Sequence, residues 1–264
     1  TCYDVSMIGI FDSGYGGLTI MKEITKLLPQ YDYLYLGDND RAPYGNHGKE
    51  TVTRFSDEAV RYLFEQGCNL IIFACFTASA LALRELQETH LRDPKSKHKN
   101  KKILGVIKPV VEYASAVSKN KTIGVVGTKG TVNSKAFEIE LKAIDPSLRV
   151  TQQACPLLVP LIEEHWHEKP EAKMILKKYL APLKSHAIDT LILGCTHYPL
   201  MYGDFKKYMG KNVSVLNPGE IVAKSLKNYL QRHTEIEKQL SKKGSRTFFT
   251  TDDADRFREF GRQF

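Results

Sequence analysis

The sequence lacks the features of membrane, secreted and disulfide-rich proteins. No hydrophobic run approaches the ~20 apolar residues that span a bilayer, and the longest, Leu70 to Cys75, is typical of a buried strand. Nothing near Thr1 resembles a secretory signal, which predicts a cytoplasmic protein with no membrane association. The five cysteines are odd in number, widely spaced and without a Cys-x-x-Cys pattern. We therefore expect free thiols and no metal site.

A nucleotide-cofactor signature is also missing. Residues 12–17, Asp-Ser-Gly-Tyr-Gly-Gly, follow an apolar run and open a helical pattern. Such a turn allows close backbone approach and presents helix N–H groups to an anion. However, Thr19 stands where a dinucleotide fingerprint needs glycine, and no Gly-Lys-Ser/Thr follows. The turn is equally compatible with ordinary strand–helix structure.

Composition indicates a folded chain of one large or two small domains. The 264 residues are 42% hydrophobic and 26% charged, which excludes global disorder. The net charge is +8, but the segment from Arg92 to Lys102 alone contributes +5, from six Lys/Arg against Asp93. We interpret it as a solvated insertion. Polyanion binding is the alternative, but no aromatic side chain interleaves with its lysines, so nucleic acid is not the expected partner.

Short, continuous apolar runs alternate with helical patterns along the whole chain. Such runs predict strands buried on both faces of a mainly parallel sheet, and hence an α/β fold. Helical spacing is clear at 52–63 and at 221–230, behind Pro218. The predicted strands are Met7–Phe11, Tyr33–Leu36, Leu70–Ala74, Ile103–Val106, Ile123–Val126, Thr190–Leu193 and Val213–Leu216.

The chain also repeats itself. The run at 8–14 resembles that at 123–129, and the run at 70–75 resembles that at 190–195, with offsets of 115 and 120 residues. Two nearly equal offsets predict two related, pseudo-symmetric α/β domains. We place the first domain at 1–105 plus 213–264, with Asp12 and Cys75, and the second at 106–212, with Glu163, Cys195 and His197.

Three strand ends carry unusual residues, and ligands of open α/β sheets bind at such ends. Besides the turn at 12–17, Cys75 lies between a strand and a helix start, where a thiolate is favoured. Cys195 and His197 are two residues apart, so on an extended segment they face together. A thiol beside an imidazole is an activated base or nucleophile. Two thiols at equivalent points of two half-domains suit removing a proton from one face of a carbon and delivering one to the other.

At this point the sequence resembles the glutamate racemases, from residue 8 to about residue 257. The resemblance implies two α/β domains with a glutamate site in the cleft between them, no cofactor, and D-glutamate supply for bacterial peptidoglycan and cell shape. A homodimer is the default expectation for such an enzyme. The motifs that carry the resemblance are Asp-Ser-Gly-x-Gly-Gly at 12–17, Pro43-Tyr44-Gly45, Cys-x-Thr-Ala-Ser at 75–79, Ala154-Cys155-Pro156-Leu157 before Pro160-Leu161-Ile162-Glu163, and Gly-Cys-Thr-His-Tyr-Pro at 194–199.

Carried over to this chain, the resemblance implies a role for each matching residue. Cys75 and Cys195 are the two acid/base thiols, Asp12 assists Cys75, and Glu163 and His197 assist Cys195. Activation by a cell-wall precursor, which is associated with family members bearing a long N-terminal extension, is not expected. The residues expected to hold substrate are Asp12, Ser13, Pro43, Tyr44, Gly45, Thr77, Thr196 and His197.

One departure from the family pattern leaves alternatives open. The family has asparagine after the first cysteine, in contact with substrate, and this chain has Phe76. The leading hypothesis is cofactor-independent interconversion of L- and D-glutamate. The alternatives are a racemase of aspartate or another acid, and a regulatory or nucleic-acid-interacting homologue with impaired activity, in which Phe76 is the lesion and the insertion 92–102 is the contact.

Overall fold

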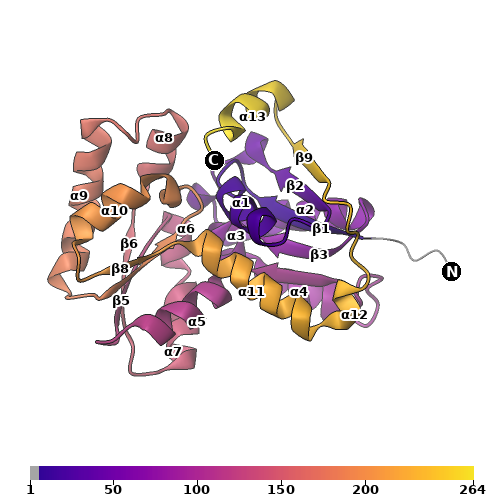
Figure 1. The fold of residues 1–264 in the computed structure, drawn as a ribbon, viewed down its shortest axis with the longest axis horizontal. Coiled ribbons are helices and arrows are strands. Elements are labelled where there is room, and N and C mark those ends of the chain that lie inside the picture. Colours follow the sequence, from indigo (N-terminus) through magenta and orange to yellow (C-terminus); the bar gives the residue numbers. More distant parts are fainter. Residues whose placement is uncertain (1–5) are drawn as a thin grey trace.

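The computed structural model describes residues 6–264 and has two β-sheets, one in each half of the molecule (Figure 1). Every strand pair within them is parallel. This confirms the predicted α/β class with two related halves. Cys2, and the stretch at Thr1 in which no secretory signal was found, lie outside the described residues.

The first sheet has five strands in the order β4-β3-β1-β2-β9. Its side chains alternate between two cores, as the two-residue period of a strand requires. Ile8 and Ile10 of β1 join one apolar cluster, and Phe11 joins the other. The strands are β1 (Met7–Asp12), β2 (Tyr33–Gly37), β3 (Cys68–Phe73), β4 (Lys102–Gly105) and β9 (Arg246–Thr250).

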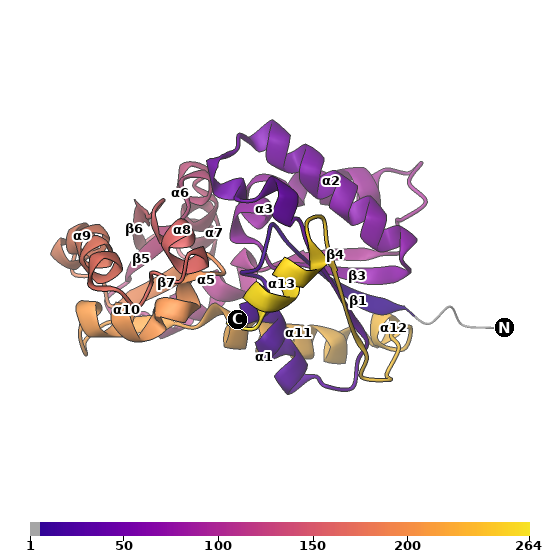
Figure 2. The same ribbon diagram turned by 90° about the horizontal axis from the view of Figure 1, so that it is seen from above.

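Helices cover both faces of this sheet. α1 and α11 pack against each other on one side, and α2 lies on the other with α3 and α4 (Figures 1 and 2). Pro218 opens α11 at a first-turn position, as predicted. The helices are α1 (Leu18–Leu27), α2 (Lys49–Glu65), α3 (Phe76–Leu81), α4 (Leu83–Gln87), a π-helical turn (Glu88–Arg92), α11 (Pro218–Arg232), α12 (Thr234–Glu237) and α13 (Ala254–Gly261), with 3-10 turns at Asn39–Arg41 and Tyr44–Asn46.

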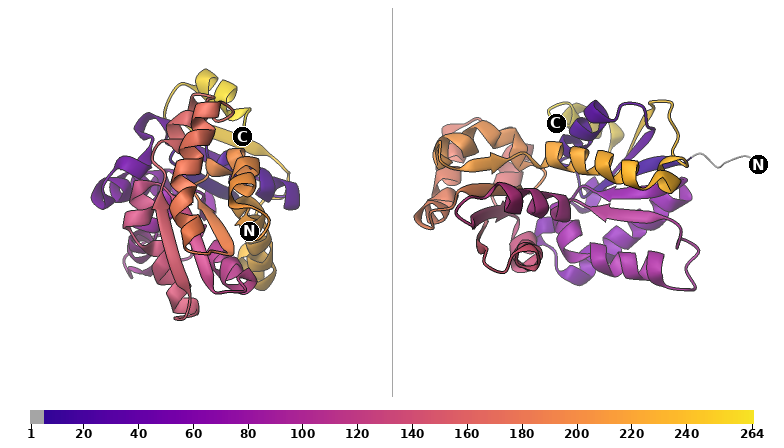
Figure 3. Two further views of the ribbon diagram at one scale, coloured as in Figure 1. Left: turned by 90° about the vertical axis from the view of Figure 1, so that its left-hand side faces the viewer. Right: turned by 60° about the horizontal axis from the view of Figure 1, so that its bottom comes forward.

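The second sheet has four strands in the order β6-β5-β7-β8. α5 connects the two halves along the chain, and α11 returns from β8 along the first half (Figure 3). The elements are α5 (Ile107–Val117), β5 (Thr122–Gly127), α6 (Lys129–Asn133), α7 (Ala136–Ile144), β6 (Arg149–Ala154), α8 (Leu158–Glu163), α9 (Pro170–Ser185), β7 (Thr190–Gly194), a 3-10 turn (Tyr198–Met201), α10 (Tyr202–Met209) and β8 (Ser214–Leu216).

The two sheets share one topology. The two sheets match when the order β4-β3-β1-β2 is aligned with the order β8-β7-β5-β6. In this alignment β1 is equivalent to β5 and β3 is equivalent to β7, which are the pairs that the two sequence offsets matched. β9 is the additional strand of the first sheet. β8 pairs with β7, so the boundary placed at 212–213 separates it from its own sheet. We therefore propose that the second domain extends to residue 216.

The seven strands expected from apolar runs are all present, but two others were not expected. β6 and β9 are edge strands with exposed or half-buried side chains, so neither has a continuous apolar run. No helix among residues 6–264 is long and apolar enough to cross a membrane. The insertion 92–102 is anchored at one end, because Lys101 Nζ donates to the carbonyl oxygens of Phe64 (3.0 Å) and Cys68 (3.1 Å).

Candidate active site

The predicted site residues gather where the carboxyl ends of equivalent strands face each other. Asp12 ends β1, Cys75 follows β3, and Cys195 follows β7. Cys75 and Cys195 are both buried, neither is in a disulfide, and both line one small cavity between the two halves. The parallel topology therefore brings together two thiols that are 120 residues apart in sequence.

Cys75 is the N-cap of α3, and its hydrogen-bond partners among residues 6–264 include no basic side chain. Its Sγ accepts from the Ala78 N–H (3.4 Å) and lies 3.5 Å from Ser13 Oγ. Burial is the main cause that raises the pKa of the Cys75 thiol to about 12, and the charge of Asp12 adds to it, although the contacts with Ser13 and Ala78 oppose the shift. In this closed arrangement Cys75 carries its proton at neutral pH.

Asp12 lies beside this half of the site without a hydrogen bond to Cys75. One carboxylate oxygen accepts from the Gly14 N–H (3.0 Å), and the other accepts from Thr196 Oγ, 3.3 Å away in the opposite half. Burial raises the pKa of the Asp12 carboxyl, against the attraction of His197 and these hydrogen bonds. Asp12 thus connects the two half-sites as well as acting on Cys75 through its charge.

Cys195 has a histidine and a glutamate behind it. His197 Nδ1 lies 3.9 Å from Cys195 Sγ, and its Nε2 lies 2.9 Å from Glu163 Oε1. The chain turns here instead of running extended, but the two side chains face together as predicted. Burial lowers the pKa of His197, yet the hydrogen bonds with Cys195 and Glu163 outweigh it and raise that pKa to about 10.

A glycine allows the two halves to meet at this histidine. A Cβ added at Gly16 would lie 2.3 Å from Thr196 Oγ and 2.5 Å from His197 Nδ1. No side chain larger than hydrogen fits there without moving the site. The Asp-Ser-Gly-Tyr-Gly-Gly turn is therefore a close-packing element of the site, and not only a strand–helix connection.

The cavity between the thiols measures about 20 Å³, which is room for about one water molecule. Glutamate is far larger, so the two halves must separate to admit it. All of the predicted residues except Asp12 and Glu163 lie in the wall. The lining residues are Ser13, Pro43, Tyr44, Gly45, Cys75, Phe76, Thr77, Thr128, Val159, Cys195, Thr196 and His197.

Sequence reasoning missed Thr128, which lines the cavity from the second half. Its Oγ lies 2.9 Å from Thr77 Oγ and 3.0 Å from Thr131 Oγ, a hydroxyl cluster across the junction. A Cβ at Gly45 would come within 2.6 Å of Thr128, so that glycine also permits close approach. The repeat contained the signal, because an offset of 115 residues places Thr128 opposite Ser13.

Phe76 forms part of the cavity wall and of the core. Its side chain is 1% exposed, and its ring stacks on Phe137 of the second half at 5.8 Å and 27°. The ring is thus accommodated by apolar neighbours across the junction, at the position where the family has an amide. A phenyl ring has no group that can replace the hydrogen bonds of that amide.

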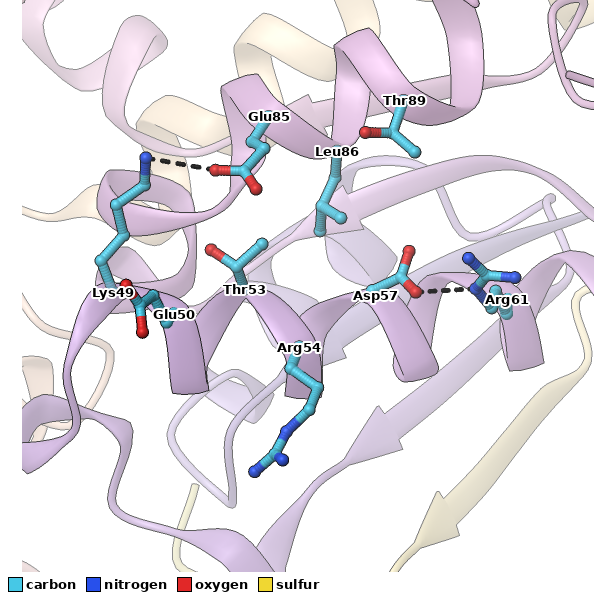
Figure 4. A pocket seen from close by; sticks show the side chains of 9 residues that line it. All are labelled: Lys49, Glu50, Thr53, Arg54, Asp57, Arg61, Glu85, Leu86 and Thr89. Carbon is cyan, nitrogen blue, oxygen red and sulfur yellow. Dashed lines mark hydrogen bonds and ion pairs between the residues drawn. The ribbon is translucent and has the colours of Figure 1, made fainter. Parts of the chain in front are cut away.

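A larger, open groove of about 610 Å³ lies between α2 and α4, away from the thiols (Figure 4). Its charged side chains are largely paired with each other, Lys49 with Glu85 at 3.1 Å and Asp57 with Arg61 at 2.7 Å. It contains none of the predicted site residues. Among residues 6–264, no three His, Cys, Asp or Glu side chains are grouped as metal ligands.

Comparison with known proteins gives a single family. The Asp/Glu/Hydantoin racemase family matches residues 8–226. A glutamate racemase from Geobacter metallireducens is 41% identical over 97% of this chain and 92% of its own length. The crystal structure of glutamate racemase isoform RacE1 from Bacillus anthracis has a TM-score of 0.88 at 36% identity, covering 98% of this chain and 93% of that one. That of the Francisella tularensis enzyme in complex with D-glutamate has a TM-score of 0.86 at 33% identity, covering 98% and 92%.

These matches place the chain in the class of racemases that are built from two related α/β halves. It belongs to the Asp/Glu/Hydantoin racemase family. The resemblance inferred from the separated sequence motifs is confirmed.

Proposed function

We propose that this enzyme interconverts L- and D-glutamate by proton transfer between two thiols. The observation that carries the proposal is the pairing of Cys75 and Cys195 at equivalent strand ends, both lining one closed cavity. Relatives named glutamate racemase, at 41% and 42% identity over nearly the whole chain, support the substrate.

The proposed step moves one proton off the α-carbon and another onto it. One thiolate removes the α-proton, and the electron pair left behind is shared with the α-carboxylate. The other thiol then gives its proton to the opposite face and becomes the thiolate for the return reaction. Negative charge grows on the α-carboxylate during this step, so hydroxyl donors placed in the cavity stabilise it most. Ser13, Thr77, Thr196 and Thr128 provide such hydroxyls.

The thiols are proposed to have different helpers. His197, which Glu163 holds through Nε2, exchanges a proton with Cys195 through Nδ1. On the other side, Ser13 contacts Cys75, and Asp12 acts through its charge. Closure of the cavity around substrate excludes water, which strengthens the donors and prevents loss of the transferred proton.

The cellular role and assembly are also proposals. D-glutamate made here supplies peptidoglycan synthesis and so cell shape, and the enzyme acts in the cytoplasm as a homodimer. The mechanism needs two free thiols, and a reducing compartment preserves them. Glutamate enters as a small-molecule substrate, and no residue's role here depends on a cofactor.

The test is substitution of each thiol. Cys75→Ala and Cys195→Ala should each abolish racemisation in both directions, whereas Cys155→Ala should lose far less, because that buried thiol lies outside the cavity lining. In heavy water the wild type should place deuterium at the α-carbon of the product enantiomer. Full racemase activity in either of the first two variants would contradict the two-thiol mechanism.

A second candidate substrate follows from Phe76, whose ring forms part of the cavity wall. The ring takes more room than the family's asparagine and cannot hydrogen-bond substrate, which favours an acidic amino acid shorter than glutamate. A chiral assay that compares glutamate with aspartate distinguishes the two, and a higher kcat/KM for aspartate would replace the first proposal.

A further inference from the structure

An aromatic cluster at the end of the described chain packs against the site. Tyr15, in the turn that follows Asp12, is stacked by three phenylalanines from α13 and the residues after it. The ring centroids of Phe257, Phe260 and Phe264 lie 5.4, 5.7 and 6.3 Å from that of Tyr15, with interplanar angles of 22°, 28° and 16°. We call these four residues the Tyr15 cluster.

Phe264 is the member of the Tyr15 cluster that meets the acid/base residues. Its ring lies 5.5 Å from the imidazole of His197, at 89°. Both side chains are buried, at 7% and 5% exposure. Lys22 Nζ donates to the Phe264 carbonyl oxygen at 3.3 Å, which fixes the backbone at this point to α1.

The segment formed by α13 and the residues after it touches both halves of the molecule. Figures 1 and 2 show α13 over the first half, with the chain end that follows it beside the second half. Phe260 contacts His165, two residues after Glu163, with ring centroids 5.4 Å apart. The segment therefore contacts residues on either side of the Glu163–His197 pair, and the Glu163 side chain is 27% exposed.

We propose that Phe264 is a positioning residue for His197, an inference that rests on the proposed racemase function. The imidazole must present Nδ1 to Cys195 and Nε2 to Glu163 at once, so small rotations of the ring weaken one contact or the other. An apolar ring against it restricts that rotation and keeps water from the Glu163 hydrogen bond. Hydrogen bonds and ion pairs are stronger where water is excluded, and a site works only while its supporting side chains hold it.

The variant that tests this is Phe264→Ala, with Phe264→Leu as the conservative replacement. Phe260→Ala is the matched control, since it removes another ring from the Tyr15 cluster but contacts His165 instead of His197. Phe264→Ala should lower kcat/KM about tenfold, almost entirely through kcat, because it misplaces a group without removing it. Phe264→Leu should recover most of the loss, and Phe260→Ala should stay within about threefold of the wild type.

Isotope effects distinguish positioning from general loosening. With 2-deuterated L- and D-glutamate, slowing only the Cys195 transfer should raise the primary isotope effect on kcat/KM for the enantiomer that Cys195 deprotonates. It should lower that effect for the other enantiomer. Glu163→Gln should raise and lower the same two isotope effects as Phe264→Ala does. The double variant of Phe264→Ala with Glu163→Gln should lose less kcat/KM than the product of the two single losses. Unchanged isotope effects, or equal losses in Phe264→Ala and Phe260→Ala, would overturn the proposal.

A readout without turnover separates this proposal from the proposed function. The imidazole N–H proton of His197 that bonds Glu163 should be visible by NMR in the wild type, Phe264→Leu and Phe260→Ala. It should be lost by exchange with water in Phe264→Ala. Persistence of that signal in Phe264→Ala would overturn the positioning role even if racemisation is confirmed. A wild type that does not racemise glutamate would refute the function, and the NMR result would still decide the role of Phe264.

Discussion

Replacing Phe76 with asparagine should raise activity and lower stability in the same variant. The Phe76 ring is 1% exposed, lines the cavity between the thiols and stacks on Phe137 across the junction. An asparagine amide in its place gains a donor and an acceptor that face a charged substrate, and it loses the apolar contact. The two effects act on different quantities and can be measured separately.

The size of each effect follows from the contacts. A hydrogen bond to a charged group contributes about 1.5–3 kcal/mol, so kcat/KM for glutamate should rise about ten- to hundredfold. Removing a fully buried phenylalanine down to alanine costs about 3–5 kcal/mol. Asparagine keeps part of the volume, so the free energy of unfolding should fall by about 2–4 kcal/mol, including the lost stacking with Phe137.

A chiral assay measures kcat/KM for glutamate, and urea denaturation measures the free energy of unfolding. Phe137→Leu is the matched control, because it removes the same stacking without adding an amide. It should lower stability and leave kcat/KM unchanged or reduced. If Phe76→Asn loses stability with no gain in kcat/KM, the missing amide does not limit this enzyme. If the wild type prefers aspartate to glutamate and Phe76→Asn reverses that preference, the second candidate substrate is favoured.

Three further predictions concern the surroundings of the thiols and the basic insertion. His197 has a pKa of about 10 against 6.5 unfolded, so its stabilisation is complete below about pH 6.5 and is lost as pH rises towards 10. The unfolding free energy lost in His197→Gln, from urea curves, should therefore be larger near pH 6 than near pH 10, by on the order of 5 kcal/mol. Gly16→Ala, whose Cβ would lie 2.5 Å from His197 Nδ1, should lower kcat/KM about 100-fold, whereas Gly48→Ala, with nothing within 4 Å, should retain it. Lys101→Met should lower the unfolding free energy by about 1–3 kcal/mol, because two carbonyl oxygens lose a charged donor. Replacing the exposed Lys99 with Met should leave the unfolding free energy unchanged. Equal effects of the two substitutions would show that the insertion is only a solvated loop.

The sequence was sufficient for the parts of the fold that are buried on both sides. Every strand with a continuous apolar run was predicted, and the two offsets identified β1 with β5 and β3 with β7 before the topology was known. β6 and β9 were missed because their exposed or half-buried side chains leave no apolar run, whereas the other two edge strands, β4 and β8, keep one. Likewise, β8 was assigned to the wrong sheet because three residues carry no information on their pairing partner.

The site residues likewise fall into those that the sequence identifies and those that only the structure identifies. Cys75, Cys195 and His197 could be chosen from their positions at strand ends, but Glu163 is half-buried at the end of a short helix and looks like any surface acid. The family motif singled it out, and in the structure its 2.9 Å contact with His197 distinguishes it from its acidic neighbours. Thr128 was missed because a threonine that caps a helix is ordinary structure, and its role in the wall depends on how closely the second half approaches.

The repeated topology explains why the thiols meet, and the differences between the halves explain how they can differ chemically. Cys75 has a hydroxyl and a backbone N–H as neighbours, whereas Cys195 has an imidazole held by a carboxylate. The enantiomers of glutamate have equal free energies in water, so the proposed enzyme has one value of kcat/KM for both directions whatever these neighbours are. The asymmetry can act only on the separate values of kcat and KM, which must change by the same factor. The two thiol environments therefore set which protonation state of the enzyme accumulates, and they leave the equilibrium between the enantiomers untouched.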